Sequence, residues 1–109
     1  MSTSIISPDN RTVRLANIIG YSDAGSRRQT LFGDANCKYV LVSVVANASI
    51  DTHTSPRNAT VNVIEGTGML AIEDSEILLE PGVFAFVPAQ AHHAIKAVTN
   101  ISFLLTLSA

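Results

Sequence analysis

The sequence has no tryptophan, a single cysteine and few charged residues. Charged side chains make up 15% of the 109 residues, well below the roughly 25% of an average soluble domain. Cys37 alone excludes an internal disulfide and any paired-cysteine zinc or redox motif. No apolar run reaches the roughly 18 residues needed to cross a bilayer, so we expect no membrane partner. The polar start, MSTSIISPDNR, does not resemble a signal peptide and predicts a cytoplasmic protein.

Basic residues are also too few and too dispersed for a nucleic-acid interface. The formal net charge is −2, and the one basic pair, Arg27-Arg28, follows Gly25-Ser26 and is expected in a solvated turn. A partner with a phosphate backbone is therefore disfavoured. By contrast, 47% of the residues are hydrophobic. A sheet that is covered on both faces loses the alternation of a solvated one, so we expect a second copy of the chain to cover part of this surface in a homodimer.

What the sequence does contain is a series of short apolar runs separated by turn signals at intervals of about ten residues, a pattern typical of an all-β sandwich or barrel. The length predicts one domain with a single core. The expected strands are Thr12 to Leu15, Gln29 to Phe32, Tyr39 to Ala46, Ile50 to His53, Thr60 to Glu65, Gly68 to Ile72, Glu76 to Leu79, Val83 to Val87, His92 to Ala97 and Ile101 to Leu107.

Local signals predict how these strands are connected. Pro81 and Gly82 suit the two central positions of a type II turn, and Glu73-Asp74 suits a hairpin loop. At most one helical turn is expected, within Leu15 to Ser22. Residues 1–10 are expected to form a flexible or strand-exchanging arm, and residues 11–109 a single barrel domain.

The segment from Gly82 to His93, GVFAFVPAQAHH, resembles the second conserved motif of the cupins, G-x5-P-x-G-x2-H-x3-N. His93 falls on the histidine of that motif. Gln90 stands at its second glycine, and Ala97 stands at its asparagine.

The first cupin motif, G-x5-H-x-H-x3/4-E-x6-G, aligns with Asn47 to Gly66. His53 falls on its first histidine and Gly66 on its closing glycine, whereas the other positions are replaced: Asn47 for glycine, Ser55 for histidine and Ala59 for glutamate. The resemblance covers roughly Tyr39 to Leu107. It implies a cupin-type jelly roll of two antiparallel sheets, and dimers in which the N-terminal arm pairs with the partner's sheet.

The resemblance also implies that His53 and His93 point into the barrel. Alternation along a strand would place Asp51 and Ser55 on the same side as His53, and would place His92 at the rim or outside. We predict a ligand pocket at His53, His93, Ser55 and Phe86. Its apolar wall is expected to come from Val61, Val63, Phe84 or Phe86, Ile95, Phe103 and Leu105, in the manner of small-molecule sites.

Four interpretations of the two histidines stay open. They could bind an organic ligand without metal, or hold a weakly bound divalent ion (Fe, Mn, Zn or Ni) completed by waters or ligand oxygens. Asp51 could join His53 and His93 in a 2-His-1-carboxylate set, or the histidines could be only structural. The sequence therefore predicts a small cupin that binds a small organic molecule. The alternatives are a metal-dependent dioxygenase or isomerase and a purely structural domain.

Overall fold

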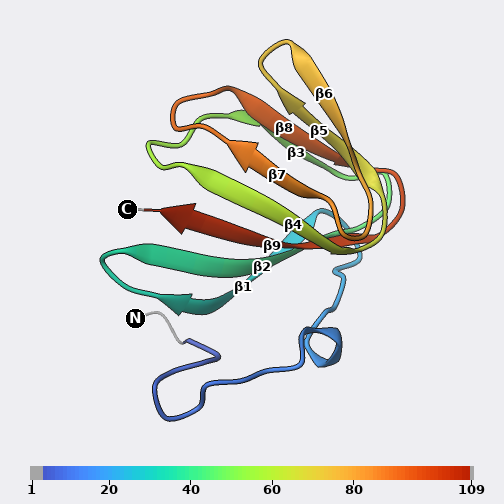
Figure 1. Ribbon diagram of the computed structural model, residues 1–109. Coiled ribbons are helices and arrows are strands. Elements are labelled where there is room, and N and C mark those ends of the chain that lie inside the picture. The colour runs from blue at the N-terminus through green and yellow to red at the C-terminus, as the bar shows by residue number, and fades with distance from the viewer. Residues whose placement is uncertain (1–3, 109) are drawn as a thin grey trace.

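A computed structural model describes residues 4–108 (Figure 1). The described chain contains nine strands and one short 3-10 helix, η1. In chain order these are η1 (Leu15–Asn17), β1 (Ser26–Gly33), β2 (Cys37–Val44), β3 (Ser49–His53), β4 (Ala59–Glu65), β5 (Gly68–Ile72), β6 (Ser75–Leu79), β7 (Phe84–Val87), β8 (His93–Ala97) and β9 (Ile101–Ser108).

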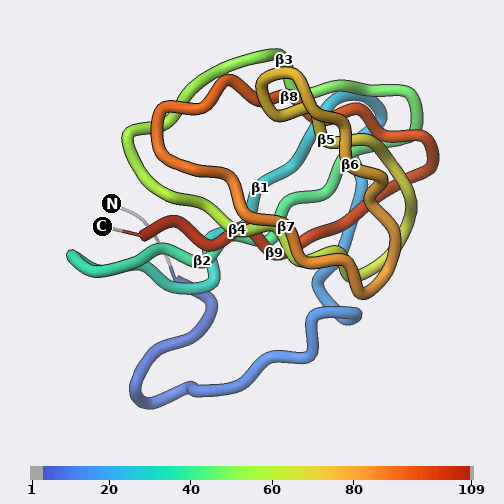
Figure 2. Tube along the Cα trace, turned by 45° about the horizontal axis from the view of Figure 1, so that its top comes forward, coloured from blue at the N-terminus to red at the C-terminus, as the bar shows by residue number. Residues whose placement is uncertain are grey.

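The strands form two antiparallel sheets. One has five strands in the order β1-β2-β9-β4-β7, and the other has four in the order β3-β8-β5-β6. Seen from a second direction, the strands wrap into a ring, and the N-terminal segment runs outside it (Figure 2). This is the predicted all-β jelly roll.

The core lies between the two sheets. In β4, Ala59, Val61 and Val63 are buried while the residues between them are more exposed. In β7, Ala85 and Val87 are buried while Phe84 and Phe86 are exposed. The period of two assigns one face of each strand to the core. The buried cluster also includes residues of β2, β5, β6, β8 and β9: Val40, Val42, Val44, Leu70, Leu79, Ile95, Ala97, Ile101 and Phe103.

Nine of the ten expected strands are present, with ends within three residues of those predicted. The exception is Thr12 to Leu15, which forms no strand. A strand needs a neighbour, and the free edge of β1 is taken by Ile5 and Ile6, whose N–H groups donate to the carbonyls of Thr30 (3.4 Å) and Leu31 (2.9 Å). The predicted helical turn is present as η1. Within residues 4–108, no helix is long and apolar enough to cross a bilayer, and the cytoplasmic location stays a prediction.

Of the arm predicted over residues 1–10, residues 1–3 lie outside the described residues. Residue 109, at the far end of the predicted barrel domain, lies outside them too. Exchange of the arm with a second copy stays a prediction. The two predicted turns are confirmed. The N–H of Val83 donates to Glu80 O at 3.0 Å across Gly82, whose φ is +91°, as in a type II turn. Ile72 pairs with Ser75, so Glu73-Asp74 is a two-residue hairpin loop.

Candidate functional site

The two histidines singled out by the sequence lie side by side at one end of the four-stranded sheet. His53 ends β3 and His93 begins β8, and the two residues are register partners in this antiparallel pair. Their ring centroids are 4.1 Å apart, with the ring planes at 59°. His93 is half-buried and His53 is exposed. The strand pairing therefore brings together two imidazoles that are forty residues apart in the chain.

A β-bulge places the His53 side chain. Ile50 pairs with Ile95 and His53 pairs with His93, so Asp51 and Thr52 on β3 together oppose the single residue Ala94 on β8. Two residues facing one is the definition of a bulge. Because the extra residue shifts the alternation by one, Ile50 and His53 both face the barrel interior although they are three positions apart.

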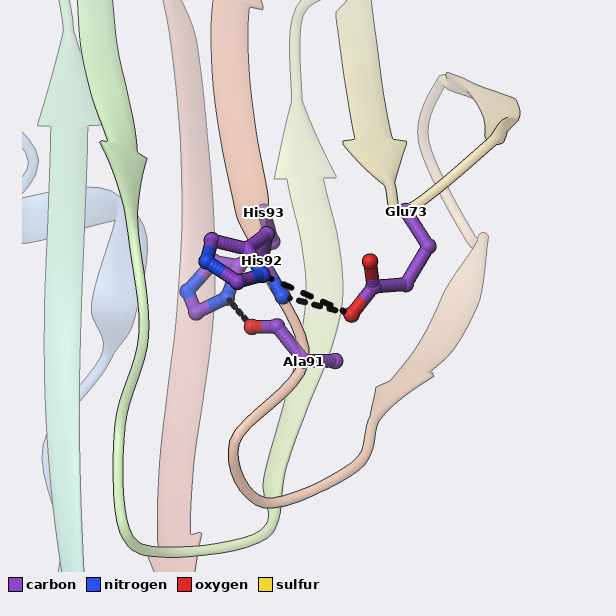
Figure 3. A network of polar contacts seen from close by, with 4 residues as sticks. All are labelled: Glu73, Ala91, His92 and His93. Carbon is purple, nitrogen blue, oxygen red and sulfur yellow. Dashed lines mark hydrogen bonds and ion pairs between the residues drawn. The ribbon is translucent and has the colours of Figure 1, made fainter.

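Backbone carbonyls fix the tautomer of both histidines. His53 Nδ1 lies 2.9 Å from Asp51 O. His93 Nδ1 lies 3.0 Å from Ala91 O (Figure 3). A carbonyl oxygen can only accept, so in each ring the Nδ1–H is the donor. In the neutral state each Nε2 then carries an unused lone pair, which can accept a hydrogen bond or bind a metal ion.

The pair lines two pockets. The inner chamber has a volume of about 30 Å³, enough for about one water molecule. Besides His53 and His93 it is lined by Arg28 and by apolar side chains from both sheets: Val42, Ile50, Ala59, Val61, Leu70, Val87, Ile95, Phe103 and Leu105. The outer chamber, which we call the mouth, has a volume of about 270 Å³ and is lined by Arg28, His53, Thr54, Ser55, Pro56, Ala59, His93, Leu105 and Leu107.

The mouth contains every position at which the cupin motifs carry a ligand-type residue. His53 and His93 retain it, whereas Ser55 and Ala59 replace the second histidine and the glutamate. The Ser55 Oγ accepts a hydrogen bond from the N–H of Arg57 at 3.2 Å. The Ala59 methyl leaves open the space that a longer side chain would occupy. The motif register is thus preserved in the fold, but two of its four polar side chains are absent.

Two sequence predictions about the site need correction. Asp51 does not face the histidines: the bulge turns it to the outer face of the four-stranded sheet, where it borders a surface groove with Thr52, Ala94 and Lys96. Among residues 4–108, no three His, Cys, Asp or Glu side chains are grouped closely enough to hold a metal ion. A 2-His-1-carboxylate set with Asp51 is therefore not formed.

Phe86 does not line the pocket either, because it is 53% exposed on the outer face of the five-stranded sheet. Its neighbour Phe84 lies on that face too, and Ala85 and Val87 take the inward positions of β7. Of the predicted wall, Val61, Ile95, Phe103 and Leu105 do line the inner chamber, whereas Val63 is buried in the core away from it.

His92 lies outside the barrel, as predicted. Its side chain is 66% exposed, and its Nδ1 lies 3.7 Å from Glu73 Oε1. The His92 N–H donates to the same oxygen at 3.0 Å (Figure 3). The N–H of Glu73 donates back to His92 O at 2.9 Å. These contacts tie the β5–β6 hairpin to the start of β8, so Glu73 and His92 hold the segment from which His93 projects.

Sequence reasoning missed Arg28. We expected Arg27-Arg28 in a solvated turn, but both residues lie in β1, where Arg28 pairs with the buried Val42 and Arg27 pairs with Ser43. Alternation therefore places Arg28 on the inner face of the sheet, where its side chain is exposed to solvent and lines both chambers. The sequence carried no clear signal for this orientation, because the residues that follow, Gln29 to Phe32, do not alternate between apolar and polar.

Comparisons with known proteins agree with this architecture. The Cupin domain family matches residues 40–107. Three solved structures are similar: a conserved protein of unknown function from Streptococcus pyogenes (20% identity, TM-score 0.84, 99% of this chain and 94% of that one); a cupin superfamily protein from Desulfitobacterium hafniense (21%, 0.83, 93% of each); and an RmlC-like cupin from Desulfovibrio desulfuricans (21%, 0.82, 90% and 95%).

No curated protein matches the chain in sequence. At such identities the structural similarity shows the fold alone, but the family match extends over more than half of the chain. This chain belongs to the cupin family.

Proposed function

We propose that this cupin binds a small organic molecule in the mouth of the barrel, at His53 and His93. The observation that carries the proposal is the orientation of the two imidazoles. Each uses Nδ1 to bind a backbone carbonyl, which leaves two Nε2 atoms for a ligand beside an apolar wall. A few convergent polar groups in an apolar cavity are the usual composition of a small-molecule site.

The burial of the pair supports a ligand-binding role over a purely structural one. A structural histidine is normally buried with both nitrogens satisfied. Here His53 is exposed and His93 is half-buried, and no hydrogen bond to Nε2 is present in either residue within the described chain. The two rings therefore contribute little that the fold itself requires.

The test combines stability with ligand screening in wild type, His53→Ala, His93→Ala and the matched control His92→Ala, whose ring lies outside the barrel. We expect each substitution to lower the free energy of unfolding by less than about 1 kcal/mol, since only exposed or local contacts are lost. Small carboxylates, phenols and sugars are then screened by thermal shift. A ligand shift present in wild type and His92→Ala but absent in the other two variants supports the proposal. Loss of about 2–3 kcal/mol in both site variants, with no ligand found, contradicts it and favours a structural domain.

A metal-dependent enzyme, such as a dioxygenase or isomerase, is the second candidate. It is supported by the Nδ1–H to carbonyl contacts, because metal-binding histidines commonly donate their second nitrogen in this way. His53 and His93 would hold a divalent ion, Fe, Mn, Zn or Ni, which would act as a Lewis acid or bind oxygen. Two imidazoles fit a weak site completed by waters or ligand oxygens, but not the three or four protein ligands of a tight one.

Elemental analysis after dialysis against a chelator separates the two candidates. We expect wild type to retain well under one metal ion per chain. The double substitution Ser55→His with Ala59→Glu restores the residue types of the first cupin motif at positions that line the mouth, and we expect it to retain an ion that wild type loses. One firmly held ion in wild type would favour the enzyme and contradict a metal-free binding site.

A further inference from the structure

The pocket carries a positive charge that has no partner in the protein. Arg28 lines both chambers, and neither lining includes an aspartate or a glutamate. Within residues 4–108 the only ion pair is that of His92 with Glu73, outside the barrel. The guanidinium is thus left to interact with solvent or with a ligand, and its planar, five-donor geometry matches a carboxylate.

The histidines add a second requirement. With Nδ1–H donated to the carbonyls of Asp51 and Ala91, each neutral imidazole presents an acceptor at Nε2. A carboxylate has only acceptor oxygens, so it suits Arg28 but not these nitrogens. A hydroxyl group can donate to Nε2. The pocket therefore offers one cluster of donors and one pair of acceptors, and a complementary ligand carries both an anionic group and a hydroxyl.

The sizes of the two chambers limit the rest of the ligand. The inner chamber of about 30 Å³ holds no more than about a methyl group or a water molecule, so the body of the ligand must lie in the mouth of about 270 Å³. That volume is just below the usual range for drug-sized ligands, roughly 300–1,000 Å³. Ala59, Leu105 and Leu107 supply an apolar wall there, which suits a short apolar group rather than a sugar.

We propose that the pocket takes small hydroxycarboxylates with a short apolar body. The carboxylate binds the Arg28 guanidinium, and the hydroxyl donates to Nε2 of His53 or His93. This proposal rests on the proposed function, since it names the ligand class of the same site and assigns specificity for charge to Arg28. A single guanidinium matches a monoanion, which favours a carboxylate over a phosphate dianion.

Three matched probes test each element of the proposal: mandelate, phenylacetate, which lacks the hydroxyl, and 1-phenylethane-1,2-diol, which lacks the charge. Affinities are measured by calorimetry or protein-observed NMR, with inorganic phosphate as a competitor. We expect mandelate to bind at least about tenfold more tightly than either analogue, because each analogue leaves one polar cluster of the site unpaired. Phosphate should compete weakly.

Arg28→Gln should reduce the affinity for mandelate to that for the diol and leave the diol unchanged. Arg27→Gln is the matched control, because Arg27 lies on the opposite face of the same strand. Arg28→Lys keeps the charge but loses the bidentate geometry, so an intermediate affinity is expected. Melting temperatures establish that all three variants fold, and they are interpreted only together with the binding data.

The failures of this proposal and of the proposed function can be distinguished. If the diol binds as tightly as mandelate, the ligand class is wrong, and if Arg28→Gln changes nothing, the assignment of charge recognition to Arg28 is wrong. The proposed function still stands in either case if the ligand shift is lost in His53→Ala and His93→Ala. If phosphate displaces mandelate at equal concentration, the site recognises anions in general and the hydroxycarboxylate class is wrong. If none of the probes binds and the wider screen is also negative, both proposals fail.

Discussion

Asn47 and Gln90 hold positive φ angles, of 70° and 71°, in positions where cupins carry glycine. An L-residue in this region is strained by about 1–2 kcal/mol, and asparagine tolerates it better than most. At both positions this chain therefore keeps a backbone conformation that suits glycine, although the residue is not glycine. The N–H of Gln90 also donates to Ser55 O at 2.7 Å, so the strained residue joins the two loops that border the mouth.

Gln90→Gly should stabilise the protein by about 0.5–1 kcal/mol, because relief of the strain exceeds the entropy that glycine adds to the unfolded chain. Asn47→Gly is the matched control and should change stability less. The measurement is the free energy of unfolding from urea titration. A larger gain at Asn47 than at Gln90 would contradict the explanation by backbone strain.

Tyr21 anchors the segment that precedes β1. Its hydroxyl donates to Glu65 Oε2 at 2.7 Å and lies 2.7 Å from Ser102 Oγ, which in turn lies 2.9 Å from the buried Ser43 Oγ. Burial, opposed in part by the Ser102 contact and reinforced by Glu65, raises the pKa of Tyr21 to about 12. The network satisfies two hydroxyls that are buried on the outer face of the five-stranded sheet.

The pKa of Tyr21 predicts a loss of stability at alkaline pH. Its pKa is higher in the folded state than the value of 10.0 for an ordinary tyrosine, so the folded state disfavours the tyrosinate. This stabilising contribution is complete below pH 10 and decreases as the pH rises toward 12. Urea unfolding between pH 8 and 11 should show a steeper loss above pH 10 in wild type than in Tyr21→Phe. Parallel curves for the two proteins would contradict the prediction.

At the scale of the strand, alternation predicted most of the fold but not the exact composition of the site. It failed at the β3 bulge, where one extra residue moved Asp51 to the outside. The sequence IDTH gives no clear signal of a bulge, because none of its residues indicates that this strand has one residue more than the segment of β8 with which it pairs. It also failed at β7, where both faces are apolar. Pairing of Ala85 with Val61 and of Val87 with Ala59 decides which face is inside, and that information lies in another strand.

Gly66 falls on the closing glycine of the first cupin motif, and the structure shows why glycine is needed there. Its φ is +86°, and a Cβ there would overlap Asn100 O and lie 2.7 Å from the Cα of Ile101. Both neighbours are backbone atoms, one in the last residue of the β8–β9 connection and one in the first residue of β9, so they cannot move without displacing β9. The closing glycine of the first motif is therefore required by close packing as well as by its backbone conformation.

Gly66→Ala should lower the free energy of unfolding by about 3 kcal/mol or more. Gly82→Ala is the matched control, because Gly82 has a similar φ of +91° but nothing within 4 Å of its Cβ position. It should cost only the conformational strain of about 1–2 kcal/mol. Equal losses in the two variants, measured by urea unfolding, would show that contact with the β8–β9 connection contributes nothing.

At the scale of the whole molecule, the outer face of the five-stranded sheet remains apolar and uncovered on its β7 side. Phe84 is 64% and Phe86 is 53% exposed. They pair with Asn62 and Thr60 on β4, which are paired in turn with Leu104 and Thr106 on β9. Two adjacent aromatic side chains among short, uncharged residues resemble the centre of a protein interface more than a solvated surface. The low charged fraction of the sequence is thus reflected in an exposed apolar area on this face of the sheet.

We propose that two copies of the chain associate through this face, and that wild type sediments at about twice 11.6 kDa at micromolar concentration. The double substitution Phe84→Ser with Phe86→Ser should give a monomer, because aromatic residues at the centre of an interface contribute most of its binding energy. Leu78→Ser is the matched control: Leu78 is 54% exposed, but it lies on β6 in the other sheet, so this variant should stay dimeric. Since neither phenylalanine lines the pocket, the monomeric variant should also bind a ligand as wild type does. A wild-type protein that sediments at 11.6 kDa, or a dimer lost equally in Leu78→Ser, would contradict the assignment of this face.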